Sequence, residues 1–114
     1  MVDHITIRKA AGMWSVRAGG AVLGESAHAL ELVEGDHPAV IYFPRADIAT
    51  AFLDASDTSS QCPHKGEARY FSVVTKSTTL TNAAWSYETP NDSVARIKGY
   101  LAFDTTGDVT VEEI

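Results

Sequence analysis

Apolar and polar residues alternate with a period of two along most of the chain, and this alternation constrains the fold more than any other feature. Ile5 and Ile7 flank a threonine, and Trp14 and Val16 flank a serine. Further short runs of the same kind follow at residues 21–23, 30–32, 68–74, 80–87, 100–103 and 109–111. The chain therefore predicts many short strands, with too few helical segments to connect a parallel sheet.

Four segments depart from this alternation. Residues 39–43 are apolar on both faces, which predicts a central strand covered on each side. Residues 45–54 change to a helical period and predict a helix of about three turns. Residues 57–61 are polar and predict a loop, and residues 90–97 predict a short helical turn.

These elements predict one α+β domain over residues 1–114, dominated by antiparallel sheet. A chain of 114 residues is long enough to bury one core. We expect two short-stranded sheets that meet at an angle or curl into an open barrel. One short helix is expected after the central strand.

Charge and composition exclude several classes of function. The formal net charge is -6, and the nine Lys and Arg residues are dispersed, so we expect no nucleic-acid partner. The start of the chain is polar and no apolar run spans a bilayer, which predicts a cytoplasmic protein without a membrane partner. Cys62 is the single cysteine, and the four histidines lack metal-ligand spacing. We therefore expect neither an intrachain disulfide nor a metal or other cofactor.

Six motifs in register give the chain a resemblance to the uncharacterised family called domain of unknown function 427. They extend over most of the sequence, from about Ile7 to Val111. They are Glu25-Ser26, Glu34 ahead of Pro38, and the segments 42–47, 62–70, 84–90 and 99–103. The resemblance implies a β-tent-like fold, in which two antiparallel sheets meet at an angle.

One name of this family suggests a nucleotidyltransferase, but the chain lacks the motifs of that activity. Such enzymes carry a Gly-Ser start to a helix and an Asp-x-Asp pair, whereas the nearest acidic pair here is Asp54 and Asp57. Zinc-bearing β-tents use paired Cys-x-x-Cys ligands, which a single cysteine cannot supply. The resemblance therefore implies a fold more than a reaction.

Residues 62–66 form the segment with the most functional character. Cys62 and His64 point the same way in an extended loop, and a nearby cation such as Lys65 would favour a thiolate. The alternative is a small buried cysteine beside a proline turn. Lys65 in turn either binds a carboxylate or phosphate of a ligand or pairs with an internal acid such as Glu34 or Asp47.

The other charged candidates also have two interpretations. Arg45 and Asp47 follow the central strand, where a cleft would open, but the first turn of a helix by itself favours a carboxylate. Glu25 and Glu34 flank a strand, where each is either a base of raised pKa among apolar neighbours or an exposed surface residue.

Aromatic residues form the last set of candidates. Trp85 and Tyr87 share one face of a predicted strand, and Tyr70 shares a face with Ala68 and Ser72 on another. Tyr42 is the fourth residue of the set. They either fill the core, with a polar tip that seeks a partner, or line a small-molecule pocket.

The sequence thus supports two hypotheses of different kinds. The first is a small-ligand-binding domain, with or without catalysis. Its ligand contacts would come from Lys65, Arg45, Tyr42, Trp85, Tyr87, Tyr70 and Glu25, and its acid, base or nucleophile from Cys62, Asp47 or Glu34. The second is a non-catalytic interaction or structural module whose partner is a protein, including its own copy as a homodimer. A nucleotidyltransferase is third.

Overall fold

The computed structural model describes residues 4–114, and the polar start of the chain at residues 1–3 lies outside the described part. All pairs of neighbouring strands are antiparallel. The elements are, in chain order, β1 (Ile5–Lys9), β2 (Trp14–Ala18), β3 (Ala21–Ser26), β4 (Leu30–Glu34), β5 (Val40–Tyr42), the 3-10 turns η1 (Arg45–Asp47) and η2 (Thr50–Phe52), β6 (Leu53–Cys62), β7 (Gly66–Val74), β8 (Thr79–Tyr87), η3 (Asp92–Ile97), β9 (Ala102–Phe103) and β10 (Val109–Glu113).

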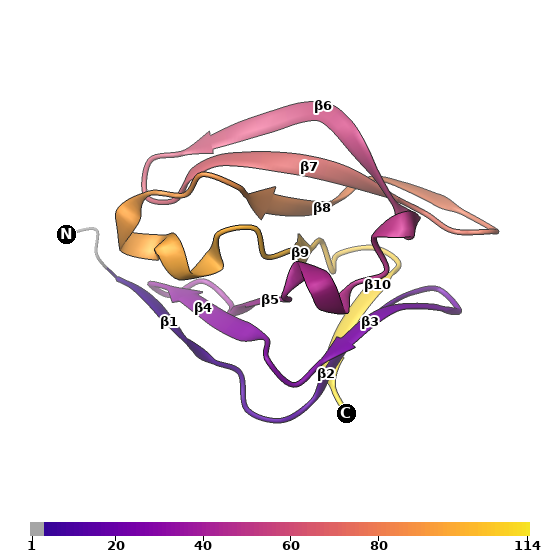
Figure 1. Cartoon of the computed structure of the whole chain (residues 1–114), viewed down its shortest axis with the longest axis horizontal. Helices are drawn as coiled ribbons and strands as arrows, with labels where there is room; N and C mark the ends of the chain where they lie inside the picture. The colour runs from indigo at the N-terminus through magenta and orange to yellow at the C-terminus, as the bar shows by residue number, and fades with distance from the viewer. Residues whose placement is uncertain (1–3) are drawn as a thin grey trace.

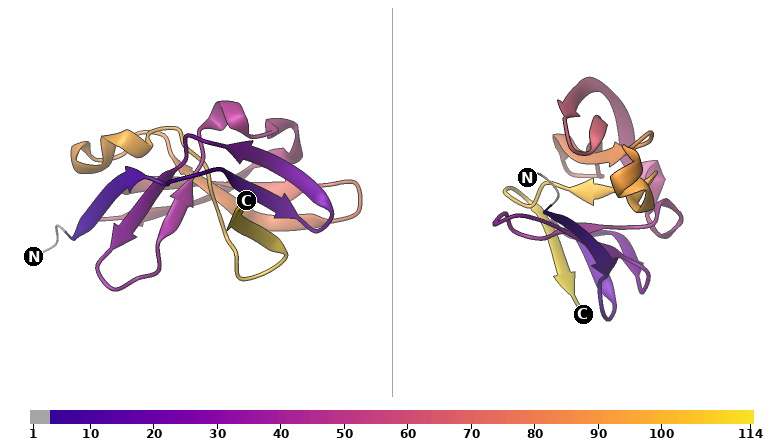
Figure 2. Two further views of the ribbon diagram at one scale, coloured as in Figure 1. Left: turned by 90° about the horizontal axis from the view of Figure 1, so that it is seen from below. Right: turned by 90° about the vertical axis from the view of Figure 1, so that its left-hand side faces the viewer.

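The strands form three small sheets, with the orders β1-β4-β5, β10-β2-β3 and β6-β7-β8-β9. A mainly antiparallel β fold is therefore confirmed, although the sequence predicts two sheets and residues 4–114 form three. Within these residues no sheet closes into a barrel. In Figure 1 strands β6 to β8 lie above and strands β1 to β4 below, and the right-hand view in Figure 2 shows the same separation.

The predicted helix over residues 45–54 is wrong. The segment holds two single 3-10 turns, and at Leu53 the chain enters β6. The backbone between the turns bonds to a neighbouring strand, since the Ala49 N–H donates to the Leu23 carbonyl at 2.8 Å. An α-helix needs such N–H groups for its own i to i−4 bonds. Tertiary backbone pairing therefore prevails over the helical period of the side chains.

The predicted loop at residues 57–61 is also wrong, because these residues belong to β6. Ser59 pairs with Arg69, and Gln61 pairs with Glu67, both on β7. Strand β6 lies at the edge of its sheet, and most of its side chains are exposed. An exposed edge strand can be polar on both faces, so it leaves no alternation in the sequence.

Strand β5 lies between two packed layers, as the apolar run at residues 39–43 predicts. Ile41 is buried in one hydrophobic cluster and Tyr42 in another. The next residue, Phe43, forms an isolated antiparallel bridge with Leu101 through two backbone hydrogen bonds of 2.8 and 2.9 Å. This bridge connects the β1-β4-β5 sheet to the segment that leads into β9.

Two core clusters follow from this arrangement. The first contains residues of β2 and β3 packed with Phe43, Val73 and Leu101. The second lies between the β1-β4-β5 sheet and strands β7 and β8, with Val94 and Ile97 of η3 completing it. Aromatic residues of the second cluster, together with polar residues outside it, form the candidate site.

Gly24 offers a direct test of the contact between β3 and η1. A Cβ atom at this position would clash with the backbone carbonyl of Asp47 and lie 2.7 Å from Cδ1 of Ile48. We predict that Gly24→Ala lowers the free energy of unfolding by about 1–3 kcal/mol, measured by urea denaturation.

Gly20→Ala is the matched control for this substitution. A Cβ atom at Gly20 meets nothing within 4 Å, so this variant should stay within about 0.5 kcal/mol of the wild type. Equal effects of the two substitutions would show that the close approach at Gly24 does not limit stability.

Candidate functional site

The candidate site is a cavity of about 360 Å³ between the β1-β4-β5 sheet and the β6-β7-β8-β9 sheet. Strands β4, β5, β7 and β8 supply most of its walls, and the 62–66 turn and the segments after β4 and β9 supply the rest. It is lined by Leu32, Glu34, His37, Pro38, Val40, Tyr42, Lys65, Tyr70, Asn82, Trp85, Tyr87 and Asp104. Six sequence-predicted residues are thus brought together: Glu34, Tyr42, Lys65, Tyr70, Trp85 and Tyr87.

Lys65 forms an ion pair with Glu34 in the wall of this cavity. Its Nζ lies 2.8 Å from Oε1 of Glu34, and the two side chains are 12% and 26% exposed. The turn that carries Lys65 is fixed by backbone bonds from Lys65 N–H to the Cys62 carbonyl and from Asn91 N–H to the Lys65 carbonyl. Of the two sequence interpretations of Lys65, the internal pair with Glu34 is the one present.

The ion pair shifts the pKa of both partners. The hydrogen bond from Lys65 lowers the pKa of Glu34, against the burial that would raise it. Burial by itself lowers the pKa of Lys65, but the hydrogen bond to Glu34 and the neighbouring Cys62 raise it above the ordinary value. Both groups therefore stay charged at neutral pH, and Glu34 is a weak base.

Four aromatic side chains also line the cavity. The Trp85 indole N–H donates to the Tyr42 hydroxyl at 3.3 Å, and burial raises the pKa of Tyr42 and of Tyr87. The Tyr70 hydroxyl lies 3.0 Å from Oγ of Ser60 on β6. Because these polar tips are held by neighbours, the rings of Trp85 and Tyr70 present fixed apolar surfaces.

Arg45 is not among the residues that line the cavity. Its guanidinium lies over the Phe71 ring, donates to the Ser86 hydroxyl at 3.2 Å and pairs with Glu88 at 3.0 Å. Ser86 alternates with Trp85 and Tyr87 along β8, so Arg45 packs against the opposite face of that strand.

Glu25, Asp47 and Cys62 also do not line this cavity. Glu25 is exposed on β3. Asp47 accepts a hydrogen bond of 2.7 Å from the Ser26 hydroxyl, which ties η1 to β3. Cys62 is a free, half-buried cysteine that packs against the second core cluster.

Four polar or turn residues of the cavity wall are not among the ligand contacts predicted from the sequence: His37, Pro38, Asn82 and Asp104. Asn82 has a positive φ of 54°, and its side-chain carbonyl is buried without a hydrogen-bond partner in the described part of the chain. A non-glycine residue with positive φ is uncommon, but no sequence signal marks it. Asp104 directly follows β9, and the alternation at residues 100–103 predicts the strand without indicating what the next side chain lines.

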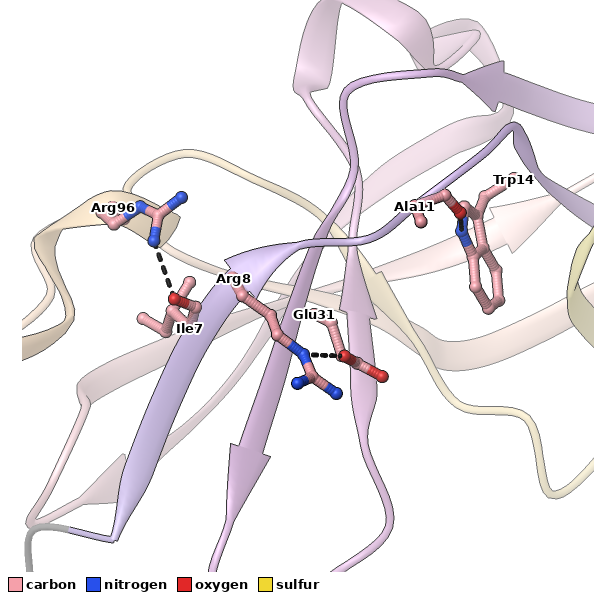
Figure 3. A network of polar contacts seen from close by, with 6 residues as sticks. All are labelled: Ile7, Arg8, Ala11, Trp14, Glu31 and Arg96. Carbon is pink, nitrogen blue, oxygen red and sulfur yellow. Dashed lines mark hydrogen bonds and ion pairs between the residues drawn. The ribbon is translucent and has the colours of Figure 1, made fainter.

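A second cavity, of about 510 Å³, adjoins the first, and the two share His37, Pro38, Val40, Trp85 and Asp104. Its own walls include Trp14, Glu31, Phe103 and Val111. Figure 3 shows the Glu31 carboxylate paired with Arg8, at 2.6 Å, and the Trp14 indole N–H bonded to the Ala11 carbonyl. The same view shows Arg96 of η3 bonded to the Ile7 carbonyl of β1.

Comparison with known proteins identifies the family of this chain. The chain matches the family described as domain of unknown function (DUF427) over residues 6–113. It therefore belongs to the DUF427 family. The comparison with curated proteins gives no match.

No three His, Cys, Asp or Glu side chains within residues 4–114 are placed to hold a metal ion. No helix in the same range has the length and apolar character needed to cross a membrane.

The half-buried position of the Lys65–Glu34 pair predicts a measurable contribution to stability. We expect Lys65→Met to lower the free energy of unfolding by about 1–3 kcal/mol, because Glu34 keeps its charge but loses its partner. Arg8→Met is the control, since Arg8 is 68% exposed in its pair with Glu31 and should cost less than about 1 kcal/mol. Equal losses in urea denaturation would contradict a special role for Lys65.

The same pair predicts a specific pH dependence. The pKa of Glu34 is lowered from 4.5, so its contribution is complete above that value and is lost as the pH falls through the folded-state pKa. The pKa of Lys65 is raised from 10.5, so its contribution is lost as the pH rises through the higher folded-state value. The stability difference between the wild type and Lys65→Met should therefore be constant near neutral pH and shrink below about pH 4.5. A difference independent of pH would assign the effect to the packing of the lysine stem.

Proposed function

We propose that the protein is a small-ligand-binding domain and that the cavity between β4, β5, β7 and β8 is its binding site. The observation that carries this proposal is the convergence of four aromatic residues and one ion pair on a single cavity of about 360 Å³. Apolar walls with a few fixed polar groups are typical of small-molecule sites, and the volume lies within their usual range.

The chemistry of the candidate catalytic residues supports binding more than catalysis. Glu34 is paired with Lys65 and its pKa is lowered, which makes it a weak general base. Asp47 bonds to Ser26 and, like Cys62, lies outside the cavity walls. The proposal therefore assigns no reaction, and a nucleotidyltransferase activity stays third because the motifs it requires are absent from the sequence.

The proposal includes a β-tent-like relation between the sheets that enclose the cavity. The two sides come from β4 and β5 on one sheet and from β7 and β8 on another. They are joined near the Phe43–Leu101 bridge. Such an arrangement leaves a wedge that side chains only partly fill.

One observation favours the second candidate, a non-catalytic interaction module. Strand β6 has ten residues, most of them exposed, and pairs on one side only, with β7. A free edge of this length can accept a further strand from a protein partner, including a second copy of the chain. A dimer in light scattering that is lost on substituting Ser59 of β6 by proline would support this candidate.

A thermal-shift screen tests the binding proposal. The probes are nucleobases, nucleosides, sugar phosphates, carboxylic acids and aromatic amines, with the wild type, Lys65→Ala and Arg45→Ala. A ligand that binds the folded state raises the melting temperature by mass action. We expect one class to stabilise the wild type and Arg45→Ala equally, because Arg45 lies outside the cavity. The same class should stabilise Lys65→Ala to a different extent, because this substitution leaves the charge of Glu34 unpaired in the cavity wall.

The control in this screen is the intrinsic melting temperature of each variant. Both substitutions remove an ion pair, so a lower melting temperature without ligand is expected for both and is not informative. Loss of the ligand response in Arg45→Ala but not in Lys65→Ala would place the binding site elsewhere.

A further inference from the structure

The charges that line the two adjoining cavities do not balance. Glu34 is paired with Lys65, and Glu31 is paired with Arg8. Asp104 lines both cavities, and within residues 4–114 no cation forms an ion pair with it. Among the carboxylate and ammonium groups of the two cavity walls, Asp104 is therefore the one left without an ion-pair partner within these residues.

The Asp104 carboxylate is held in place by uncharged groups. Its Oδ1 accepts hydrogen bonds from the Thr106 backbone N–H at 2.9 Å and from the Thr106 hydroxyl at 2.6 Å. These bonds lower the pKa of Asp104, so the group is charged throughout the physiological range. They engage only one of the two carboxylate oxygens.

Trp85 lies beside this charge in the fold. Both residues line both cavities, and the Asp104 N–H bonds to the Ala83 carbonyl, two residues from Trp85 on β8. An indole ring is the aromatic surface that attracts cations most strongly, and a nearby carboxylate adds to that attraction. The Asp104 carboxylate would repel an anionic ligand. Lys65 would attract such a ligand only weakly, because its ammonium is already paired with Glu34.

From this geometry we infer that the site selects a flat cationic ligand, such as an aromatic amidine or a protonated nitrogen heterocycle, and that Asp104 is the residue that determines this charge preference. The ligand stacks on Trp85 with its positive group toward Asp104. This inference rests on the proposed function and specifies its ligand class. It departs from the anion-binding role that the sequence allows for Lys65 and Arg45.

Three probes of the same shape and different charge test the inference: benzamidinium, benzamide and benzoate. Binding to the wild type is followed by the shift of the Trp85 indole N–H resonance, assigned with Trp14→Phe, at pH 8 and low salt. We expect benzamidinium to bind about tenfold more tightly than benzoate, with benzamide between them. Added salt should reduce the difference, because Asp104 is exposed.

Asp104→Asn and Asp108→Asn form the matched pair of variants. Both remove one charge from the segment between β9 and β10, but Asp108 lines neither of the two cavities. The asparagine at position 104 keeps an oxygen for the Thr106 bonds, so the turn should be retained. Asp104→Asn should lower benzamidinium affinity about tenfold and leave benzamide unchanged, and Asp108→Asn should change either by less than about twofold.

Three results would overturn the inference. Benzoate that binds as tightly as benzamidinium would refute the charge preference but leave the proposed binding function intact. Equal effects of the two aspartate substitutions would remove the specific role of Asp104. Absence of binding by all three probes would refute the flat-cation class, while the broader thermal-shift screen decides separately whether the cavity binds any small molecule.

Discussion

The backbone bridge between Phe43 and Leu101 is the contact on which the rest of the structure depends. Both residues are fully buried, and both of their N–H groups are satisfied by each other's carbonyl oxygens. The bridge joins the end of β5 to the segment before β9, residues that are far apart in the sequence. It thereby fixes the sheet that contains β4 and β5 relative to the sheet that contains β7 and β8. A buried backbone pair of this kind is costly to break, because the freed groups could not reach water.

The cavity follows from the position of this bridge. Tyr42 precedes Phe43 and faces the second core cluster, where its hydroxyl receives the indole N–H of Trp85. Further along, Glu34 and Lys65 meet as an ion pair across the same space. Both pairs join side chains from opposite walls of the cavity, and they thereby fix the separation of the walls. A rigid cavity of this kind costs little to organise when a ligand binds.

Several parts of the site could be predicted from the sequence, and others could not. Trp85 and Tyr87 lie two residues apart on a strand, so their shared face follows from the period of two alone. The sequence allows Lys65 either to pair with an internal acid such as Glu34 or to bind a ligand, and it does not decide between these two roles. Arg45 and Asp47 follow Tyr42 closely in the chain, yet both lie outside the cavity. Arg45 bonds to Ser86, and Asp47 bonds to Ser26. Asp104 follows the alternating run at residues 100–103, but that pattern does not tell which surface the residue after the strand lines.

The sequence by itself determined that the fold is mainly antiparallel β, the family and the aromatic character of the second core cluster. These properties depend on local alternation and on motifs that are contiguous in the chain. Tertiary structure alone decided that residues 45–54 are not a helix, that the polar residues 57–61 extend an edge strand, and that the described residues form three sheets. It also decided which charges are neutralised and that, in the part of the chain from residue 4 onward, Asp104 has no cationic partner. The physical reason is that backbone pairing and ion pairing connect residues distant in sequence, and their free energies outweigh the small local propensities on which a sequence pattern depends.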